Sequence, residues 1–213
     1  ETTRRDDRFW SWKHERNPFG SSMLLLGEKS GSLVGLRAFM HWQWQADGKT
    51  CPAVRAVDTV THPDHQRKGI FTQLTQAGLG AAKSAGMAFV FNTPNPNSMP
   101  GYLKMGWQHV ARLPMQVRVL NPFRFAAGLA RTKLFPAWRP KKAATTTDGF
   151  RATSQLVTDF LDGAPELEAL IVRDATLRGR GFTTARSIAF LRWRYAEHPY
   201  VSYYVETVHE GGR

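Results

Sequence analysis

In the first sixty residues, one charged stretch rich in aromatic side chains is followed by runs in which apolar and polar residues alternate with a period of two. The charged stretch 5–16 predicts a helix. Its end is expected at Asn17-Pro18, because a residue before proline avoids the helical region. Between residues 22 and 44 the pattern predicts two strands joined by a turn at 29–31.

A second set of signals continues the same domain. Asp47-Gly48 is a strong hairpin signal and predicts a third strand after it. The stripe of apolar residues after Gly69 predicts a helix that ends near Gly86. A short buried strand should follow at 87–92, then a loop rich in Asn and Pro with one or two helical turns within 93–107, and a final hairpin at 108–120. This order predicts an α/β fold, with a mixed central sheet flanked by helices.

A short sequence repeat links the two ends of the chain. Residues 9–21 align with 190–202 at one fixed offset. The matched pairs are Phe9 and Phe190, Trp12 and Trp193, Lys13 and Arg194, Pro18 and Pro199, Phe19 and Tyr200, and Ser21 and Ser202. We therefore expect three units: a domain at 1–120, a basic helix and linker at 121–149, and a partial second copy of the domain at 150–213. The second copy stops after its first strand, so the chain is either a truncated tandem protein or one with a vestigial second half.

Composition narrows the class of protein. Lys and Arg outnumber Asp and Glu by 29 to 17, and the net charge of +12 favours an anionic partner: nucleic acid, an acidic membrane surface or a phosphorylated ligand. The single cysteine, Cys51, excludes a disulfide framework and a zinc site built from several cysteines. With no signal peptide and no apolar run of membrane-spanning length, we expect a cytoplasmic protein.

The turn before the predicted helix carries the clearest chemical signal. Gln66, Arg67 and Lys68 precede Gly69, where the helix begins. A helix N-terminus offers unpaired N–H groups to phosphate oxygens, and glycine lets a ligand approach the backbone closely. An ordinary strand–turn–helix with a solvated basic turn would show the same residues, so this turn alone does not decide between the two interpretations.

A second motif makes the phosphate interpretation the better one. Residues 66–71, QRKGIF, fit a Q/R-x-x-G-x-G/A pattern except for Phe71, and residues 102–107 read YLKMGW. With the order of elements, these motifs resemble the GNAT N-acetyltransferase superfamily over about residues 5–120. The turn is closest to tandem-domain members of the enhanced-intracellular-survival type, where a bulky apolar residue also stands at the place of Phe71.

The resemblance implies a function and a set of site residues. It implies acetyl-CoA as co-substrate, no metal, and direct transfer of an acetyl group to a primary amine of a small molecule or sugar. Backbone groups of Thr59, Val60 and Thr61 would pair with the pantetheine arm, with Asn97 and Ser98 beside it. The diphosphate would be held by N–H groups of Arg67, Lys68, Gly69, Ile70, Phe71 and Thr72.

The same resemblance assigns an acid and leaves the base open. Tyr102 would protonate the departing thiolate, because a phenol stays protonated at neutral pH and can still release its proton to sulfur. The alternative interpretation of Tyr102 is a core aromatic residue whose hydroxyl already has a hydrogen-bond partner. Asp58, on the strand before the turn, is our candidate base, with His41 and His62 as alternatives. Each of the three also has a structural interpretation, as a paired, capping or turn residue.

Residues 121–142 interleave aromatic with basic side chains. This pattern is typical of a helix that packs one domain on another, and also of a membrane-surface helix; we favour packing. We expect no nucleic-acid partner, because no helix-turn-helix, zinc or RNA-recognition signature is present. The rival to the enzyme is a non-catalytic GNAT-like module for binding or membrane docking. The acceptor, the acyl chain length and the oligomeric state stay open.

Overall fold

A mixed β-sheet is the centre of the computed structural model, which describes residues 6–111, 123, 126–127, 155–163, 165–177 and 181–207. The strands follow the order β1-β2-β3-β4, with β6 paired to β2. Their bounds are Met23–Lys29 for β1, Ser32–Ala46 for β2, Lys49–Thr61 for β3, Phe89–Phe91 for β4 and Thr183–Thr184 for β6. The first three are antiparallel, and β4 is parallel to β3.

The two hairpins end in the turns that the sequence predicts. Asp47 and Gly48 have φ values of 49° and 71°, and Ser30 and Gly31 have 51° and 77°. Two consecutive residues with positive φ give a turn whose twist matches that of the strands. The long ribbon of β2 and β3 follows from these turns, with Trp44 opposite Cys51 near its end.

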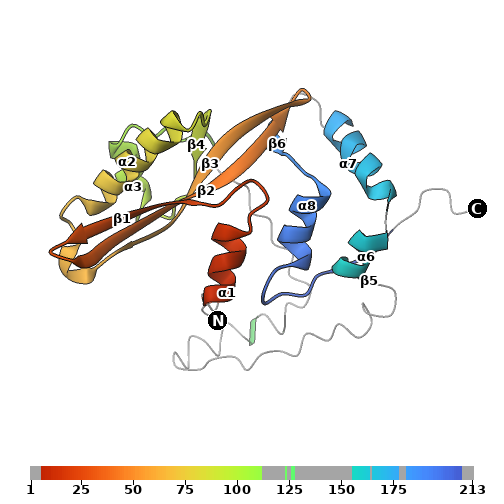
Figure 1. The fold of residues 1–213 in the computed structure, drawn as a ribbon, viewed down its shortest axis with the longest axis horizontal. Helices are drawn as coiled ribbons and strands as arrows, with labels where there is room; N and C mark the ends of the chain where they lie inside the picture. The colour runs from red at the N-terminus through yellow and green to blue at the C-terminus, as the bar shows by residue number, and fades with distance from the viewer. Residues whose placement is uncertain are drawn as a thin grey trace, which may run out of the picture.

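Helices cover both faces of the sheet (Figure 1). On one face lie α2, Ile70–Ser84, and α3, Met99–Lys104. The core there consists of Phe39, Val54, Ala56 and Ala82. Helix α2 lies very close to β2, because a Cβ at Gly78 would stand 2.0 Å from the Phe39 ring. On the other face lies α1, Asp7–Trp10, which continues as a π-helical turn, η1, at Ser11–Glu15.

The C-terminal part forms a smaller unit beside this face. Its core is Val157, Leu161 and Leu167. Its elements are β5 at Gln155–Leu156, α6 at Val157–Gly163, α7 at Glu166–Leu177, α8 at Ile188–Leu191, the π-helical turn η3 at Arg192–Ala196, and β7 at Tyr204–Val205. Strands β5 and β7 pair with each other, whereas β6 extends the main sheet.

The α/β class and the mixed sheet with helices on its faces are confirmed. The predicted final hairpin and the basic segment 121–142 lie largely outside the described residues. The division into units at 1–120, 121–149 and 150–213 stays a prediction. None of the helices in the described part of the chain combines the length and the apolar character needed to cross a membrane.

Candidate active site

Strands β3 and β4 separate after a short parallel pairing. The pairing ends at Arg55 and Phe91, whereas β3 continues to Thr61. Over the described residues no strand pairs with that edge of β3 beyond Arg55, so this part of the edge can pair with an extended ligand, although the Val57 carbonyl already accepts from Arg37. The β2–β3 register shifts between Arg37 and Phe39, which places a bulge at this point of β3.

The turn after β3 borders a cavity of about 480 Å³. It is lined by Thr59, Thr61, His65, Gln66, Arg67, Gly69, Ile70, Phe71 and Thr72. Gly69 precedes α2 with φ of 79°, and among the residues that the structure describes no side chain caps the helix, so its first amides can bind another acceptor. Arg67 is also left-handed, with φ of 59°. Successive amides in such turns form concave sites for anions.

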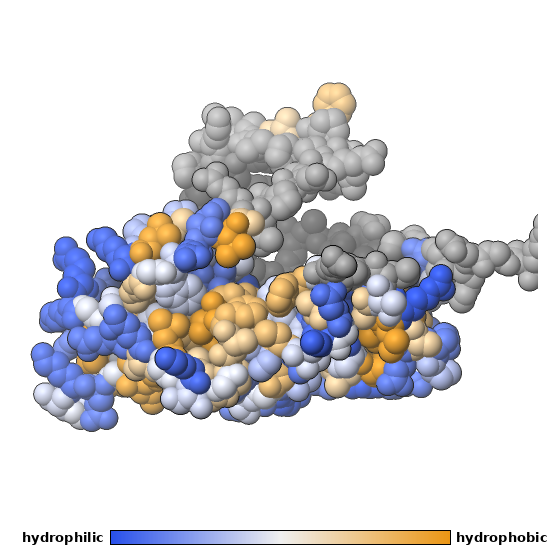
Figure 2. Space-filling view, turned by 90° about the horizontal axis from the view of Figure 1, so that it is seen from above, coloured by the Kyte–Doolittle hydropathy of each residue, from blue (hydrophilic) through white to orange (hydrophobic). Residues whose placement is uncertain are grey.

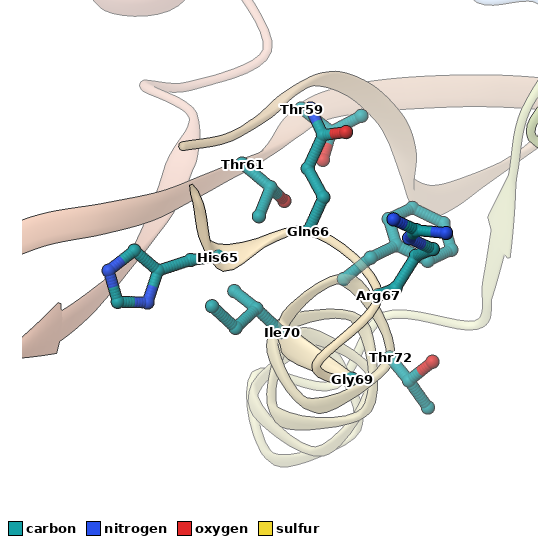
Figure 3. Close-up of a pocket in the computed structure, with 9 residues that line it drawn as sticks. Thr59, Thr61, His65, Gln66, Arg67, Gly69, Ile70 and Thr72 are labelled. Atoms are coloured by element: carbon teal, nitrogen blue, oxygen red, sulfur yellow. The ribbon is translucent and has the colours of Figure 1, made fainter. Parts of the chain in front are cut away.

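Basic side chains surround this turn. Lys68 donates from Nζ to the carbonyl oxygen of Asp64 at 2.7 Å. Desolvation, together with the positive charges of Lys68 and Lys29, lowers the pKa of His65. Figure 2 shows hydrophilic residues gathered at the end of the molecule where β1 and β2 are joined. In Figure 3, Gln66 extends toward Thr59 while His65 points away from the helix.

The cavity contains most, though not all, of the predicted cofactor residues. Thr59, Thr61, Arg67 and the start of α2 from Gly69 to Thr72 line it. Val60, which is 64% exposed, and Lys68 do not line it. Asn97 and Ser98 lie outside it as well, just before α3, where the Ser98 amide donates to Oδ1 of Asn95 at 2.9 Å. Gln66 and His65 line the cavity without having been among the predicted binding residues, although Gln66 belongs to the motif that pointed to the turn.

Tyr102 lies beneath the bulge of β3. Its side chain is 5% exposed, and its hydroxyl accepts a hydrogen bond from Nη2 of Arg37. The other terminal nitrogen of Arg37 donates to the carbonyl oxygen of Val57 at 2.8 Å. The Tyr102 ring also contacts Phe71 and Trp107, with centroid distances of 5.4 and 4.7 Å. Arg37 therefore links the phenol to the strand that borders the opening.

Phe71 packs where the motif usually has a small residue. Its ring is perpendicular to that of Tyr102, and the Arg37 guanidinium lies 5.4 Å from its centroid. A Cβ at Gly101 would stand 3.1 Å from Phe71 Cε1, which is tight. Glycine at position 101 therefore makes room for the larger ring at position 71.

Asp58 lies on the other face of the sheet from Tyr102, against η1. Its carboxylate accepts hydrogen bonds from Nζ of Lys13 and, at 3.0 Å, from Nε2 of His14. Burial opposes ionisation of Asp58, but the hydrogen bonds and charges of His14 and Lys13 outweigh it, and the pKa lies well below its usual range. A paired carboxylate is the structural alternative that was stated for Asp58, but its partners Lys13 and His14 were not predicted; the polar KHE run inside an aromatic helix was the only signal for them.

The alternative base candidates also have local partners. His41 donates from Nδ1 to the carbonyl oxygen of Ser21 at 2.6 Å. His62 accepts from the amide of Asp64 at 3.3 Å. Within the described residues, no cluster of three or more His, Cys, Asp or Glu side chains could hold a metal ion.

Comparison with known proteins places the chain in a family. The model of the acetyltransferase (GNAT) domain matches residues 2–110, which contain strands β1 to β4, the turn before α2 and Tyr102. The chain belongs to the GNAT acetyltransferase family. A search of curated proteins finds no match.

Solved structures with a similar fold cover less than half of this chain. An aminoglycoside acetyltransferase from an uncultured soil metagenomic sample is 18% identical with a TM-score of 0.37, covering 46% of this chain and 66% of its own. Glucosamine-6-phosphate N-acetyltransferase from Arabidopsis thaliana is 15% identical with a TM-score of 0.39, and the match covers 47% of this chain and 67% of that protein. A GCN5-related N-acetyltransferase from Ralstonia eutropha is 18% identical with a TM-score of 0.39, and the match covers 43% of this chain and 62% of that protein. This chain thus spans about two thirds of each, and likeness at this level carries no argument about substrates.

Proposed function

We propose that the chain binds acetyl-CoA and transfers its acetyl group directly to a primary amine of a small molecule or sugar. Three features support this proposal: the cavity at the start of α2, the edge of β3 beyond Arg55, and the Tyr102 hydroxyl beneath the bulge of β3. The first suits a diphosphate, the second an amide-containing arm, and the third a thioester at the arm's end.

The reaction follows from this placement. The amine nitrogen attacks the carbonyl carbon of the thioester, the C–S bond breaks, and its electron pair stays on sulfur. Tyr102 donates its proton to that sulfur, and the amine gives up a proton to a base or to water. Positioning of amine and thioester supplies much of the rate, because it replaces a bimolecular encounter. Asp58 is retained as the candidate base, and its carboxylate accepts hydrogen bonds from Lys13 and His14.

Calorimetry with CoA tests the binding half of the proposal. We expect CoA to bind at micromolar to submillimolar concentration, and Arg67→Gln to weaken binding because it removes a charge at the cavity. Lys83→Gln is the matched control, since Lys83 lies in the last turn of α2, away from the cavity. Absence of binding at about 1 mM CoA, with the fold intact, would exclude the proposal.

Replacement of Tyr102 tests the chemical half. Tyr102→Phe keeps the ring and removes the hydroxyl, so we expect kcat to fall by about 10²- to 10⁴-fold with little change in CoA affinity. The measurement is release of CoA thiol against a panel of amines. Unchanged kcat would show that another group protonates the sulfur.

A non-catalytic GNAT-like module is the second candidate, and the pairing of Asp58 favours it. A carboxylate already bound by Lys13 and His14 is a weak base. This candidate predicts CoA binding with only background thioester hydrolysis in the presence of every amine tested. The same thiol-release assay therefore separates the two.

A further inference from the structure

Arg37 is a buried guanidinium in the middle of β2. Arg37 is 1% exposed and is among the largest fully buried side chains. A buried charge is expensive unless it is paired and hydrogen-bonded. In the part of the chain that the structure describes, no carboxylate forms an ion pair with Arg37. The presence of a buried positive charge at this position therefore calls for another explanation.

Aromatic rings and two oxygen acceptors surround this charge. The rings of Phe39, Phe71 and Tyr102 lie 5.2, 5.4 and 5.5 Å from its Cζ. Its terminal nitrogens donate to the Val57 carbonyl and the Tyr102 hydroxyl, while Nε has no hydrogen-bond partner among the described residues. Cation–π contacts and two hydrogen bonds compensate the charge only in part. Additional negative charge at the Tyr102 oxygen would complete the compensation.

The direction of the hydrogen bond determines where the phenol proton can go. A guanidinium only donates, so the Tyr102 oxygen must accept from Arg37. The proton of Tyr102 is therefore directed to a different acceptor. Ring contacts with Phe71 and Trp107 restrict rotation of the phenol, so its oxygen stays fixed against Arg37.

We propose that Arg37 is a positioning residue for acetyl transfer: it holds the Tyr102 oxygen so that the phenol proton reaches the departing sulfur, and it stabilises the phenolate that remains. This inference rests on the proposed function. In the step, the O–H bond of Tyr102 breaks and an S–H bond forms on CoA. The electron pair of the O–H bond stays on the phenolate oxygen next to Arg37, and water later returns a proton.

A double-mutant cycle between Arg37 and Tyr102 tests the inference. Arg37→Met removes the charge and keeps an apolar stem, and we expect kcat to fall by about 10- to 100-fold, the range for loss of a hydrogen bond to a charged group. The KM for acetyl-CoA should stay within about threefold of wild type, because binding does not use Arg37. In the Tyr102→Phe background, Arg37→Met should change kcat by less than about twofold, because the group it acts through is gone.

Two further variants keep the test sharp. Arg37→Lys retains a buried positive charge that can donate to Tyr102, so it should recover part of the lost kcat, and it serves as the main variant if Arg37→Met does not fold. Lys83→Met, on the exposed end of α2, removes a positive charge without touching Tyr102 and should have wild-type kcat. Circular dichroism and thermal unfolding of each variant separate loss of fold from loss of the step.

Each outcome supports or overturns the inference. If Arg37→Met lowers kcat equally with Tyr102 present or absent, Arg37 does not act through the phenol and the inference is wrong, although acetyl transfer stands. If Tyr102→Phe retains wild-type kcat, the role of Tyr102 and this inference both fail, and the CoA calorimetry still stands. If no amine is acetylated, the cycle is measured on hydrolysis of bound acetyl-CoA; absence of that reaction also overturns both proposals.

Discussion

Two helical segments with matching sequences, 7–22 and 188–203, fold alike and pack against each other (Figure 1). Each begins with a side-chain cap: Asp6 accepts from the amide three residues on, and Ser187 does the same. Each then makes one α-helical turn followed by a π-helical turn. The two matching sequences therefore adopt the same backbone conformation.

The contacts between the segments are reciprocal. Trp12 Nε1 donates to the Trp193 carbonyl and Trp193 Nε1 donates to the Trp12 carbonyl, both at 2.7 Å. Their rings stack with centroids 5.0 Å apart. The flanking rings follow the same exchange, with Phe9 on Tyr200 and Phe190 on Phe19. This symmetry is the structural feature behind our proposal that residues 150–213 are a partial second copy of the first domain.

The segments differ in what lies over their last turn. In the first, His14 contacts Ser22 and Asp58 of β3. At the matching positions of the second, Tyr195 contacts Tyr203, ring to ring at 5.2 Å, and Tyr195 is 37% exposed. The same helix therefore makes polar contacts with β3 in one place and presents an aromatic surface in the other. The strand packed against it decides which.

The largest expected effect comes from breaking the reciprocal pair. Trp12→Ala should lower the free energy of unfolding by about 3–5 kcal/mol, and Trp193→Ala by a similar amount. The double variant should lose clearly less than the sum, because both changes remove the same contacts. Urea unfolding of the three variants measures this. A large effect from only one tryptophan would contradict the symmetry.

Removal of the charge on Asp58 should have the next largest effect. Asp58→Asn leaves Lys13 and His14 without their carboxylate and should lower the free energy of unfolding by about 1–3 kcal/mol at pH 7. Because the pKa of Asp58 is lowered in the folded chain, its contribution is present above the ordinary value of 3.8 and is lost as pH falls below it. The wild type should therefore approach the variant in stability on acidification.

Asp162→Asn, in α6, is the matched control for the second segment, because Asp162 pairs with Arg192 of that segment. Its carboxylate pairs with Arg192 at 2.6 Å but is 60% exposed. Exposed pairs contribute little, so the change should be below about 0.5 kcal/mol. Equal effects at Asp58 and Asp162 would mean that the covering strand does not distinguish the two segments.

His198 offers a smaller, pH-dependent difference. Burial and the charge of Arg194 lower the pKa of His198, whereas the matching position in the first segment holds the neutral Asn17. The unfolded chain therefore binds more protons there below the ordinary value of 6.5, and stability falls as pH drops through it. In urea unfolding between about pH 7.5 and 5, His198→Asn should reduce that slope. An unchanged slope would mean that other groups cause the pH dependence of the free energy of unfolding.

The smallest effect concerns Tyr200 and Asp6. The hydrogen bond from the Tyr200 hydroxyl lowers the pKa of Asp6. Tyr200→Phe makes the position equal to Phe19, and the pKa of Asp6 should rise toward its ordinary value when carboxyl resonances are followed by NMR. Phe19→Tyr in the first segment should leave Asp6 unchanged, and a rise in that variant would point to a general loosening of the interface.

Much of the scaffold followed from local chemistry. Asp47-Gly48 formed the predicted hairpin, and Gly69 adopted the left-handed conformation before α2. These positions are predictable because only a few residue types tolerate such backbone angles. The partners of Arg37 and Asp58 were not predicted. Arg37 meets a tyrosine 65 residues away, and Asp58 meets a histidine 44 residues away.

By itself the sequence determined the turns, the helix at position 70, the class of the fold and the motifs that point to a bound nucleotide. Period, capping and turn chemistry act between residues a few positions apart, so they can be followed along the chain. Only the tertiary structure decided that a buried arginine holds the Tyr102 hydroxyl and that Asp58 is already paired. Those properties arise from desolvation and contact between distant segments, and both depend on how the strands and helices pack rather than on any local pattern.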